Sequence, residues 1–476
     1  MSNLRALFAE WKPDQPAYLN EGLTVADGCV PIANGYAPFG SFTASTNGTL
    51  ASRCYGATAY RTSDATYLFA ATATNIYRYS TAGYASLIGS LDNTKRARFA
   101  SYATLMLATN GVNSIKKFDP AAPGAMTNLG GSPPIARYIA VVGGFTVLAY
   151  VSNSPTRVAW SDQGNPENWT AGGASEAGVF DMAGGGDITG IIGGEYGLIF
   201  QENRIVRMDY TASDTIWQFN EIATDIGCVI PGSLVTWGKL TFFYSTRGFM
   251  ICDGASVTPI GNEKVDRWFK GRSDRSYYDS VTSVIDPSNS LYIVSVPSAF
   301  PANTLLIFNY TLGKWSTASL PVEFMAPGYA QSITLEDLDV IYGNLDAIPI
   351  SLDSESLKGG SPLMLIFNDQ HALGALSGPP LPASFVDSKR EPITGRQARL
   401  RSVRPITDAA APMVTIAGAN SLSDTPSPTT YSARRGNGTL PVRESWNSFQ
   451  ATLTIPSQPW SFCQGIDIAL EQGGRA

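Results

Sequence analysis

The residues that could carry catalysis are few. Histidine occurs once in the 476 residues, as His371, within the polar run 368–374 (NDQHALG). A Ser-His-Asp or Cys-His mechanism would need a nucleophile and an orienting group beside that histidine. The sequence contains no GxSxG element to supply the nucleophile. We therefore expect His371 to have a structural or surface role, and we expect the protein not to be an enzyme.

Metal and cofactor chemistry finds no support in the sequence either. A single histidine excludes a histidine-rich metal site. Walker A motifs, dinucleotide fingerprints and EF-hand loops are absent. The cysteines are odd in number, widely spaced and never arranged as CxxC, which favours buried free thiols in a reducing compartment. They are Cys29, Cys54, Cys228, Cys252 and Cys463. We expect no metal and no cofactor.

Basic residues gather once, toward the end of the chain, where only Glu391 opposes them. The basic cluster consists of Lys389, Arg390, Arg396, Arg399, Arg401 and Arg404. Residues 380–476 hold ten basic and seven acidic side chains, whereas residues 1–379 hold 23 and 32. The cluster is either a solvated strand face or a contact with an acidic subunit partner or with DNA phosphates.

The composition is that of a folded globular protein, with 44% hydrophobic and 15% charged residues. The net charge of −6 is a poor match for wrapping nucleic acid, but it suits a surface past which DNA slides. Charges interrupt the first residues, so we expect no secretory signal. The longest apolar run, 138–151, is too short to span a bilayer and reads as a hairpin. We expect a soluble protein that is assembled in a cytoplasm and does not insert into membranes.

The elements that must position these residues are mostly short strands. Helical periodicity is confined to the first dozen residues and to residues 263–270. Elsewhere, runs rich in Val, Ile, Tyr, Phe and Thr are separated by Gly, Asn, Asp, Ser or Pro. Strand–turn–strand units recur, and their second strands end near positions 79, 118, 161, 209, 253 and 309. A repeat of roughly 40–50 residues is typical of β-propeller blades.

The sequence therefore predicts an all-β protein with about six irregular blades. We expect an extended N-terminal arm at 1–45 that packs on the platform, a β-propeller at 46–330, and a β-rich platform or sandwich domain at 331–476. Alternation of apolar and polar residues predicts strands at 413–416, 449–455 and 465–471 of that last domain. The abundant aromatic residues are expected to pack between blades.

Several motifs, in this order along the chain, resemble tail proteins of short-tailed bacteriophages. They are residues 11–16 (WKPDQP), 28–36 (GCVPIANGY), 157–162 (RVAWSD), 166–169 (PENW), 187–192 (DITGII), 198–208 (LIFQENRIVRM), 460–468 (WSFCQGIDI) and 473–476 (GGRA). The family they resemble is the podophage tail nozzle or tail hub proteins, also described as packaged-DNA stabilisation or tail-accessory factors. The resemblance runs over most of the chain.

The resemblance implies a non-enzymatic virion protein. Six copies would form a homohexameric ring below the head-to-tail adaptor protein, assembled in the host cytoplasm and located in the virion tail. The ring would extend the DNA channel, retain the packaged DNA and conduct it during ejection without specific binding. Tail fibre, tailspike or needle proteins are further expected partners. Trp11 of the arm and the basic cluster are the candidate partner contacts.

Two alternatives stay open from the residues alone. Residues 160–169 (WSDQGNPENW) look like the Asp-box turn of sialidases, although the spacing differs. A carbohydrate-active or carbohydrate-binding propeller would need two facing carboxylates or exposed aromatic stacking surfaces. A protein-interaction propeller of the bacterial cytoplasm is the other alternative.

Overall fold

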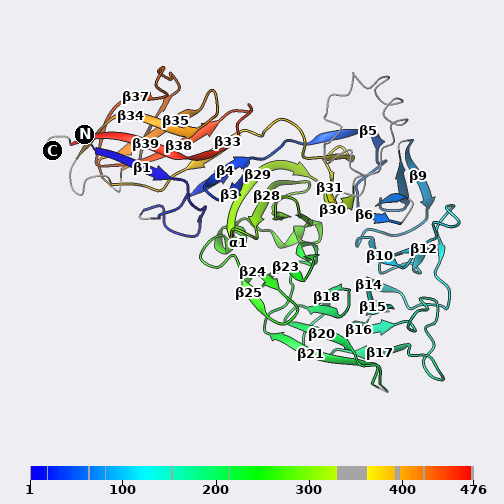
Figure 1. Ribbon diagram of the computed structural model, residues 1–476. Helices are drawn as coiled ribbons and strands as arrows, with labels where there is room; N and C mark the ends of the chain where they lie inside the picture. The colour runs from blue at the N-terminus through cyan, green and yellow to red at the C-terminus, as the bar shows by residue number, and fades with distance from the viewer. Residues whose placement is uncertain are drawn as a thin grey trace.

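The computed structural model describes residues 2–472 apart from 330–361, 392–396 and short gaps at 19, 63–64, 81, 152–153, 214 and 422–423. Figure 1 shows a ring of blades beside an elongated β-rich domain, with both termini at the far end of that domain. The predicted fold class is confirmed: the chain is all-β, with a β-propeller, a C-terminal β-sandwich and an N-terminal arm.

The first four blades are separate antiparallel sheets, each made from consecutive strands. Blade 1 is β6 (Gly56–Arg61), β7 (Thr66–Ala71), β8 (Ile76–Ser80) and β9 (Gly83–Ile88). Blade 2 is β10 (Arg98–Tyr102), β11 (Leu105–Thr109), β12 (Lys116–Phe118) and β13 (Thr127–Asn128). Blade 3 is β14 (Ala136–Val142), β15 (Phe145–Val151), β16 (Ser154–Trp160) and β17 (Gly178–Asp181). Blade 4 is β18 (Ile188–Ile192), β19 (Gly197–Gln201), β20 (Arg204–Tyr210) and β21 (Trp217–Thr224).

Three more blades close the ring, so the propeller has seven blades where about six are predicted. Blade 5 is β22 (Val235–Trp237), β23 (Leu240–Ser245), β24 (Gly248–Cys252) and β25 (Val257–Pro259). Blade 6 is β26 (Ser283–Asp286), β27 (Leu291–Ser295), β28 (Ala302–Asn309) and β29 (Lys314–Val322). Blade 7 is β30 (Phe324–Tyr329), β31 (Pro362–Phe367), β32 (Ala372–Ala375) and β5 (Thr43–Thr49).

Blade 7 corrects the predicted domain limits at 46 and 330. Its outer strand β5 comes from the N-terminal segment, where Thr49 pairs with Ala372 and Thr43 with Ala375. Its strands β31 and β32 lie beyond the predicted limit of residue 330, in the part of the chain that is predicted to belong to the platform domain. The propeller therefore extends from Thr43 to Ala375. The sequence reads as loop-rich over 331–380, which β31 and β32 correct for residues 362–375, while residues 331–361 lie outside the described residues.

Each pair of neighbouring blades buries apolar side chains between its sheets, as predicted for the aromatic residues. Phe69 and Phe118 meet edge to face between blades 1 and 2, with ring centroids 5.1 Å apart. Phe242 stacks on Tyr292 between blades 5 and 6 at 5.0 Å. Such pairs add about 0.5–1.5 kcal/mol to the burial of the rings themselves. The middle strands are buried on both faces, as in β19 (GLIFQ), which makes the propeller a stiff, dry wall.

The C-terminal domain is a sandwich of two sheets. One sheet contains β1 (Ser2–Leu7), β3 (Cys29–Ile32), β4 (Gly35–Pro38), β34 (Ala398–Thr407), β37 (Leu440–Trp446) and β39 (Cys463–Gln472). The other contains β2 (Val25–Asp27), β33 (Ala383–Val386), β35 (Met413–Ala419), β36 (Ser427–Tyr431) and β38 (Ser448–Ile455). The strands β35, β38 and β39 confirm the three predicted from alternation.

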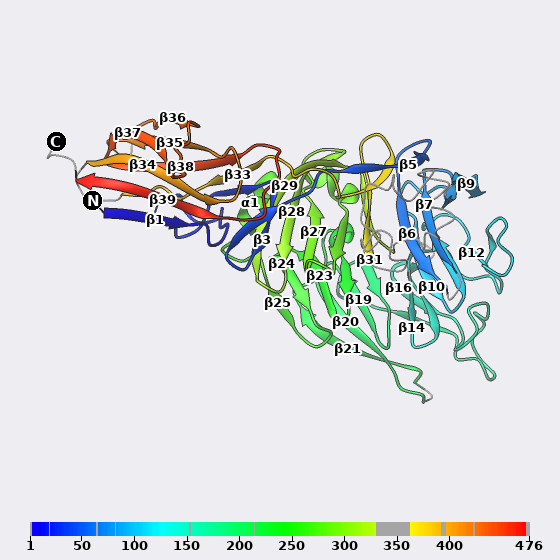
Figure 2. The same cartoon turned by 45° about the horizontal axis from the view of Figure 1, so that its top comes forward.

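Sandwich and propeller are joined through hydrogen-bonded backbone. The strand β2 pairs in parallel with β29 of blade 6 and antiparallel with β33 of the sandwich. Blade 6 and the second sandwich sheet thus form one nine-stranded sheet. Figure 2 shows β29 and β33 on either side of this junction. The two domains are therefore continuous in backbone hydrogen bonding, through the pairing of Asp27 with Thr317 on one side and of β2 with β33 on the other.

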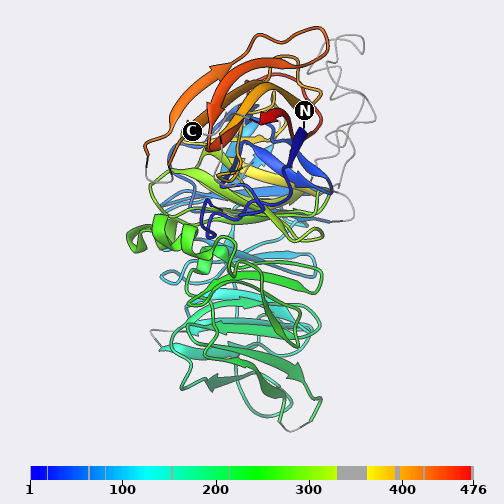
Figure 3. The ribbon, with the colours of Figure 1, turned by 90° about the vertical axis from the view of Figure 1, so that its left-hand side faces the viewer.

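The first dozen residues are not helical, which corrects the periodicity reading. Leu4, Ala6 and Phe8 alternate toward the core, and Leu4 pairs with Ile468 of β39. A short apolar run fits both the helical period of 3.6 residues and the strand period of two residues, and here pairing with β39 makes it a strand. The helix predicted at 263–270 exists as α1 (Asp266–Arg272), preceded by η1 (Pro231–Ser233) and followed by η2 (Arg275–Ser280). It projects from the side of the stacked blades in Figure 3.

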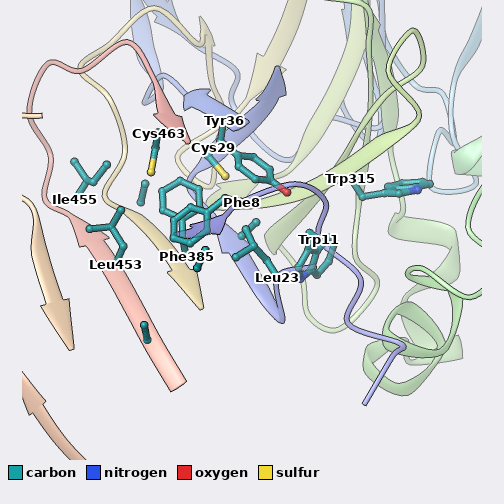
Figure 4. Packing of buried hydrophobic residues seen from close by; sticks show 14 of the residues in the cluster. Phe8, Trp11, Leu23, Cys29, Tyr36, Trp315, Phe385, Leu453, Ile455 and Cys463 are labelled. Atoms are coloured by element: carbon teal, nitrogen blue, oxygen red, sulfur yellow. The ribbon is translucent and has the colours of Figure 1, made fainter. Parts of the chain in front are cut away.

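The N-terminal arm packs in the core at the junction. Figure 4 shows Phe8, Cys29 and Tyr36 of the arm around Phe385 of the sandwich, with Trp11 further toward the propeller. The Phe8 ring stacks on Phe385 with centroids 5.4 Å apart. The arm therefore packs on the platform as predicted, and it also contacts the propeller.

Candidate functional site: the propeller channel and its arginine-lined mouth

A cavity of about 270 Å³ follows the propeller axis. The innermost strands β6, β10, β14, β18, β26 and β30 line it, and blade 5 contributes the turn η1. Hydroxyl groups of Thr58, Thr189 and Ser283 alternate there with aliphatic side chains. All seven blades therefore contribute to one cavity.

Arg96 lines this axial cavity and also two neighbouring cavities, of about 50 and 290 Å³. Its backbone has φ +81°, a left-handed conformation that non-glycine residues rarely adopt. Its guanidinium donates to the carbonyl of Val281 and lies 5.2 Å from the centre of the Phe324 ring. Burial, followed by the charges of Arg98 and Arg53, lowers the pKa of Arg96 to about 9.

Three further arginines, Arg53, Arg98 and Arg137, line these cavities together with Arg96. We call the region that the four arginines line the arginine-lined mouth. The guanidinium carbon of Arg53 lies 3.6 Å from the centre of the Phe300 ring. That of Arg98 lies 4.3 Å from the centre of the Tyr138 ring, and burial lowers its pKa, with the charge of Arg137 lowering it further. These cation–π contacts fix the guanidinium planes but do not cancel their charge.

Two arginine nitrogens at this mouth are buried without a hydrogen-bond acceptor in the described part of the chain: the Nε atoms of Arg53 and Arg137. A terminal nitrogen of Arg137 lies 3.8 Å from Asp279, whose side chain is 90% exposed and thus well screened by water. Such orphaned donors cost free energy when no acceptor is present.

The second carboxylate at this mouth is already engaged. Glu323 is buried, accepts a hydrogen bond from the backbone of Cys54, and lies 2.5 Å from Nδ1 of His371. His371 therefore holds a structural carboxylate, as its predicted structural role requires. Around the three cavities, Arg53, Arg96, Arg98, Arg137 and Lys95 face Asp279 and Glu323 among the described residues.

The predicted basic cluster lies elsewhere, on the sandwich. Arg399, Arg401 and Arg404 project from the exposed face of β34, between buried Leu400 and Val403. Arg401 donates to Glu471 at 2.7 Å, and Arg404 stands opposite Asp467 in the register. This charged face continues onto β1, where Arg5 donates to Asp467 at 2.7 Å. The structure thus brings part of the cluster together as a solvated strand face.

Of the other predicted contact residues, those within the described part of the chain, Trp11, Lys389 and Arg390, do not lie on β34. Arg390 forms a paired hydrogen bond with buried Asp387, at 2.8 Å for one nitrogen, and its backbone pairs with Phe449. The backbone of Lys389 donates to Ala17 of the arm. Arg396 lies outside the described residues. Trp11 is only 2% exposed and packs inside this chain, which corrects its assignment as a partner contact.

Sequence reasoning missed the arginine-lined mouth. Arg53, Arg96, Arg98 and Arg137 are distributed over two connecting segments and two inner strands, and only Arg96 and Arg98, together with Lys95, form a local run of basic residues. The recurrence of an arginine at the start of neighbouring inner strands β10 and β14 is the signal that could have found two of them.

The fold and this site define a seven-bladed β-propeller with a β-sandwich joined to its sixth blade. No family model and no curated protein matches the sequence. Among solved structures, similarity extends to a chain of the mitotic checkpoint complex (11% identity, TM-score 0.40, covering 72% of this chain and 95% of that one). It also extends to the dihydro-heme d1 dehydrogenase NirN (9% identity, TM-score 0.33, covering 74% of this chain and 67% of that one). A quinoprotein alcohol dehydrogenase-like protein from Bacteroides thetaiotaomicron has 11% sequence identity and a TM-score of 0.34, and the match covers 56% of this chain and 65% of that one. In the described residues, no helix is long and apolar enough to cross a membrane.

Proposed function

We propose that this protein is a structural subunit of a phage tail nozzle, six copies of which form a ring that extends the DNA channel. The resemblance of the ordered sequence motifs to podophage tail hub proteins suggests the class. The observation that supports it most is the nine-stranded sheet that joins blade 6 to the sandwich. A conduit under the pressure of packaged DNA needs subunits whose domains do not move against each other, and shared backbone pairing provides that.

The sandwich offers a surface suited to contact between copies. The strand β1 is an edge strand with Leu7 54% exposed at its end. Arg5, Asp467, Arg404 and Glu471 place both signs of charge on the adjoining face. An exposed edge strand beside a face with both signs of charge offers groups that can bind a different surface of a neighbouring copy, which is the kind of contact a ring requires. The acidic balance of residues 1–379 would let DNA pass without sticking.

Negative-stain imaging and mass photometry of the purified chain, alone and with adaptor complexes, test the proposal. We expect sixfold rings, and Arg404→Glu should reduce their population because it reverses one charge of the sandwich face that we assign to contact between copies. Arg157→Glu is the matched control, since Arg157 lies on the exposed face of blade 3 beside Asp181. Monomers under all conditions that hydrolyse or retain glycans would support the carbohydrate-active or carbohydrate-binding alternative. Monomers that do neither would favour a protein-interaction propeller.

A further inference from the structure

The arginines at the propeller mouth carry more positive charge than their surroundings neutralise. Four guanidinium groups and Lys95 line three adjoining cavities with two carboxylates, of which Glu323 is committed to His371 and Asp279 is almost fully exposed. Arginines that lie close together at a partly buried site repel one another, and this repulsion lowers the free energy of unfolding. The cost is offset when an anion binds between them.

The geometry also says what kind of anion fits. The Nε atoms of Arg53 and Arg137 have no acceptor among the described residues, and these arginines line the cavities of about 290 Å³ and 50 Å³, respectively. Guanidinium groups bind carboxylate and phosphate oxygens in a planar, paired manner. The rings of Phe300 and Tyr55, at 3.6 and 4.8 Å from the Arg53 guanidinium carbon, hold that group in place. A cavity of about 290 Å³ is large enough for a small molecule and too small for a folded partner.

We propose that the arginine-lined mouth of the propeller channel is a binding site for a small molecule that carries an oxyanion, either a phosphate or a carboxylate group. Arg96, which lines all three cavities, is its central anion-binding residue, with Arg53 beside it in the cavity of about 290 Å³ and Arg137 beside it in the cavity of about 50 Å³. The site is independent of the proposed ring, because every residue that forms it lies within one propeller.

The first experiment is calorimetric titration of the full chain with inorganic phosphate and, separately, with citrate, at ionic strength matched with sodium chloride. We expect saturable binding of at least one of the two. Tighter binding of phosphate indicates a phosphorylated ligand, and tighter binding of citrate indicates a carboxylated one. Absence of saturable binding to both would overturn the proposal, as would binding of duplex DNA when neither small anion binds.

Variants locate the binding. Arg53→Met should weaken it about tenfold or more, since one charge-assisted contact is lost. Arg157→Met, which removes an exposed arginine from blade 3, is the matched control and should bind as the unmodified chain does. Equal affinity of the Arg53→Met variant and the unmodified chain would contradict the assignment.

Thermal unfolding, measured without and with phosphate, supplies a second readout. In phosphate-free buffer Arg53→Met should raise the melting temperature or leave it unchanged, because mutual repulsion is relieved, and phosphate should no longer raise it. If Arg53→Met does not fold, Arg137→Lys keeps the charge and loses the planar fork, and it should weaken binding while preserving the circular dichroism spectrum. Unaltered phosphate stabilisation in Arg53→Met, or in Arg137→Lys when that variant is used, would overturn the proposal.

Discussion

The indole of Trp11 meets that of Trp268 edge to face, with ring centroids 5.0 Å apart. This contact joins the N-terminal arm to helix α1 of the propeller. Trp11 also donates its indole N–H to the carbonyl of Thr24, and Asp14 accepts the backbone N–H groups of Arg267 and Trp268 at 2.8 and 2.7 Å. The arm therefore both packs against α1 and caps its first turn.

Replacing Trp11 should destabilise the protein more than replacing any exposed tryptophan. Trp11→Ala leaves a cavity at a site only 2% exposed and should cost about 3–5 kcal/mol in the free energy of unfolding. Trp237→Ala, at a side chain 44% exposed, is the matched control and should cost less than about 1 kcal/mol. Urea denaturation followed by circular dichroism measures both, and similar costs would contradict the core role of Trp11.

The pair of His371 and Glu323 should be energetically coupled. His371→Ala leaves buried Glu323 without one of its partners and should cost about 2–4 kcal/mol. In a Glu323→Gln background the same change should cost clearly less, because no buried charge remains. A double-mutant cycle should give a coupling of about 1–3 kcal/mol, and additive effects would show that the contact carries no energy.

Asp266 should make stability fall as pH rises. Burial raises its pKa to about 6, above its ordinary value of 3.8, so the folded protein holds a proton that the unfolded chain has lost. The resulting loss in the free energy of unfolding is absent below about pH 4 and complete above about pH 6. Asp266→Asn keeps an acceptor for the backbone N–H of Phe249, 3.0 Å away, and should gain roughly 1 kcal/mol at pH 7 after allowance for solvent screening.

Unfolding titrations at pH 4 and pH 7 check this expectation. The gain from Asp266→Asn should vanish at the lower pH. Asp369→Asn, in an exposed turn, serves as the control and should show no such difference. A gain of equal size at both pH values would mean that protonation of Asp266 is not its cause.

The five cysteines should be unreactive in the native protein. All are buried free thiols, which confirms the expectation from their spacing, and burial raises the pKa of each. Since the thiolate is the reactive form, a thiol-specific reagent at pH 8 should modify none of them before unfolding and all five in denaturant. Rapid modification of any one in folded protein would reveal local opening at that site.

The sequence predicted the six blades whose hairpins are contiguous, because a buried strand, a turn and a second strand leave a local pattern. The run 197–209 is an example, with β19 and β20 paired from Gly197 to Met208. Blade 7 left no such pattern, since its outer strand β5 lies far from β32 in the chain. Pairing over that distance is a tertiary event that local periodicity does not record.

The candidate site divides in the same way. The alternation of Arg399, Leu400 and Arg401 marks an exposed strand face, and the structure has that face. At the mouth of the channel, the short basic run of Lys95, Arg96 and Arg98 is visible in the sequence. The cavities that Arg96 shares with Arg53 and with Arg137 form only when the blades pack around the axis, and local sequence does not record that packing.

The position of β5 has a consequence for biosynthesis. This strand leaves the ribosome before blade 1, yet its partner Ala372 follows only after the other six blades. The nascent chain must carry an unpaired strand through most of translation, and the edge of β32 must capture it at the end. Folding that depends on pairing between such distant segments is slow. Removal of the first 49 residues, which include β5, would leave β32 with an unpaired edge that could pair with another chain.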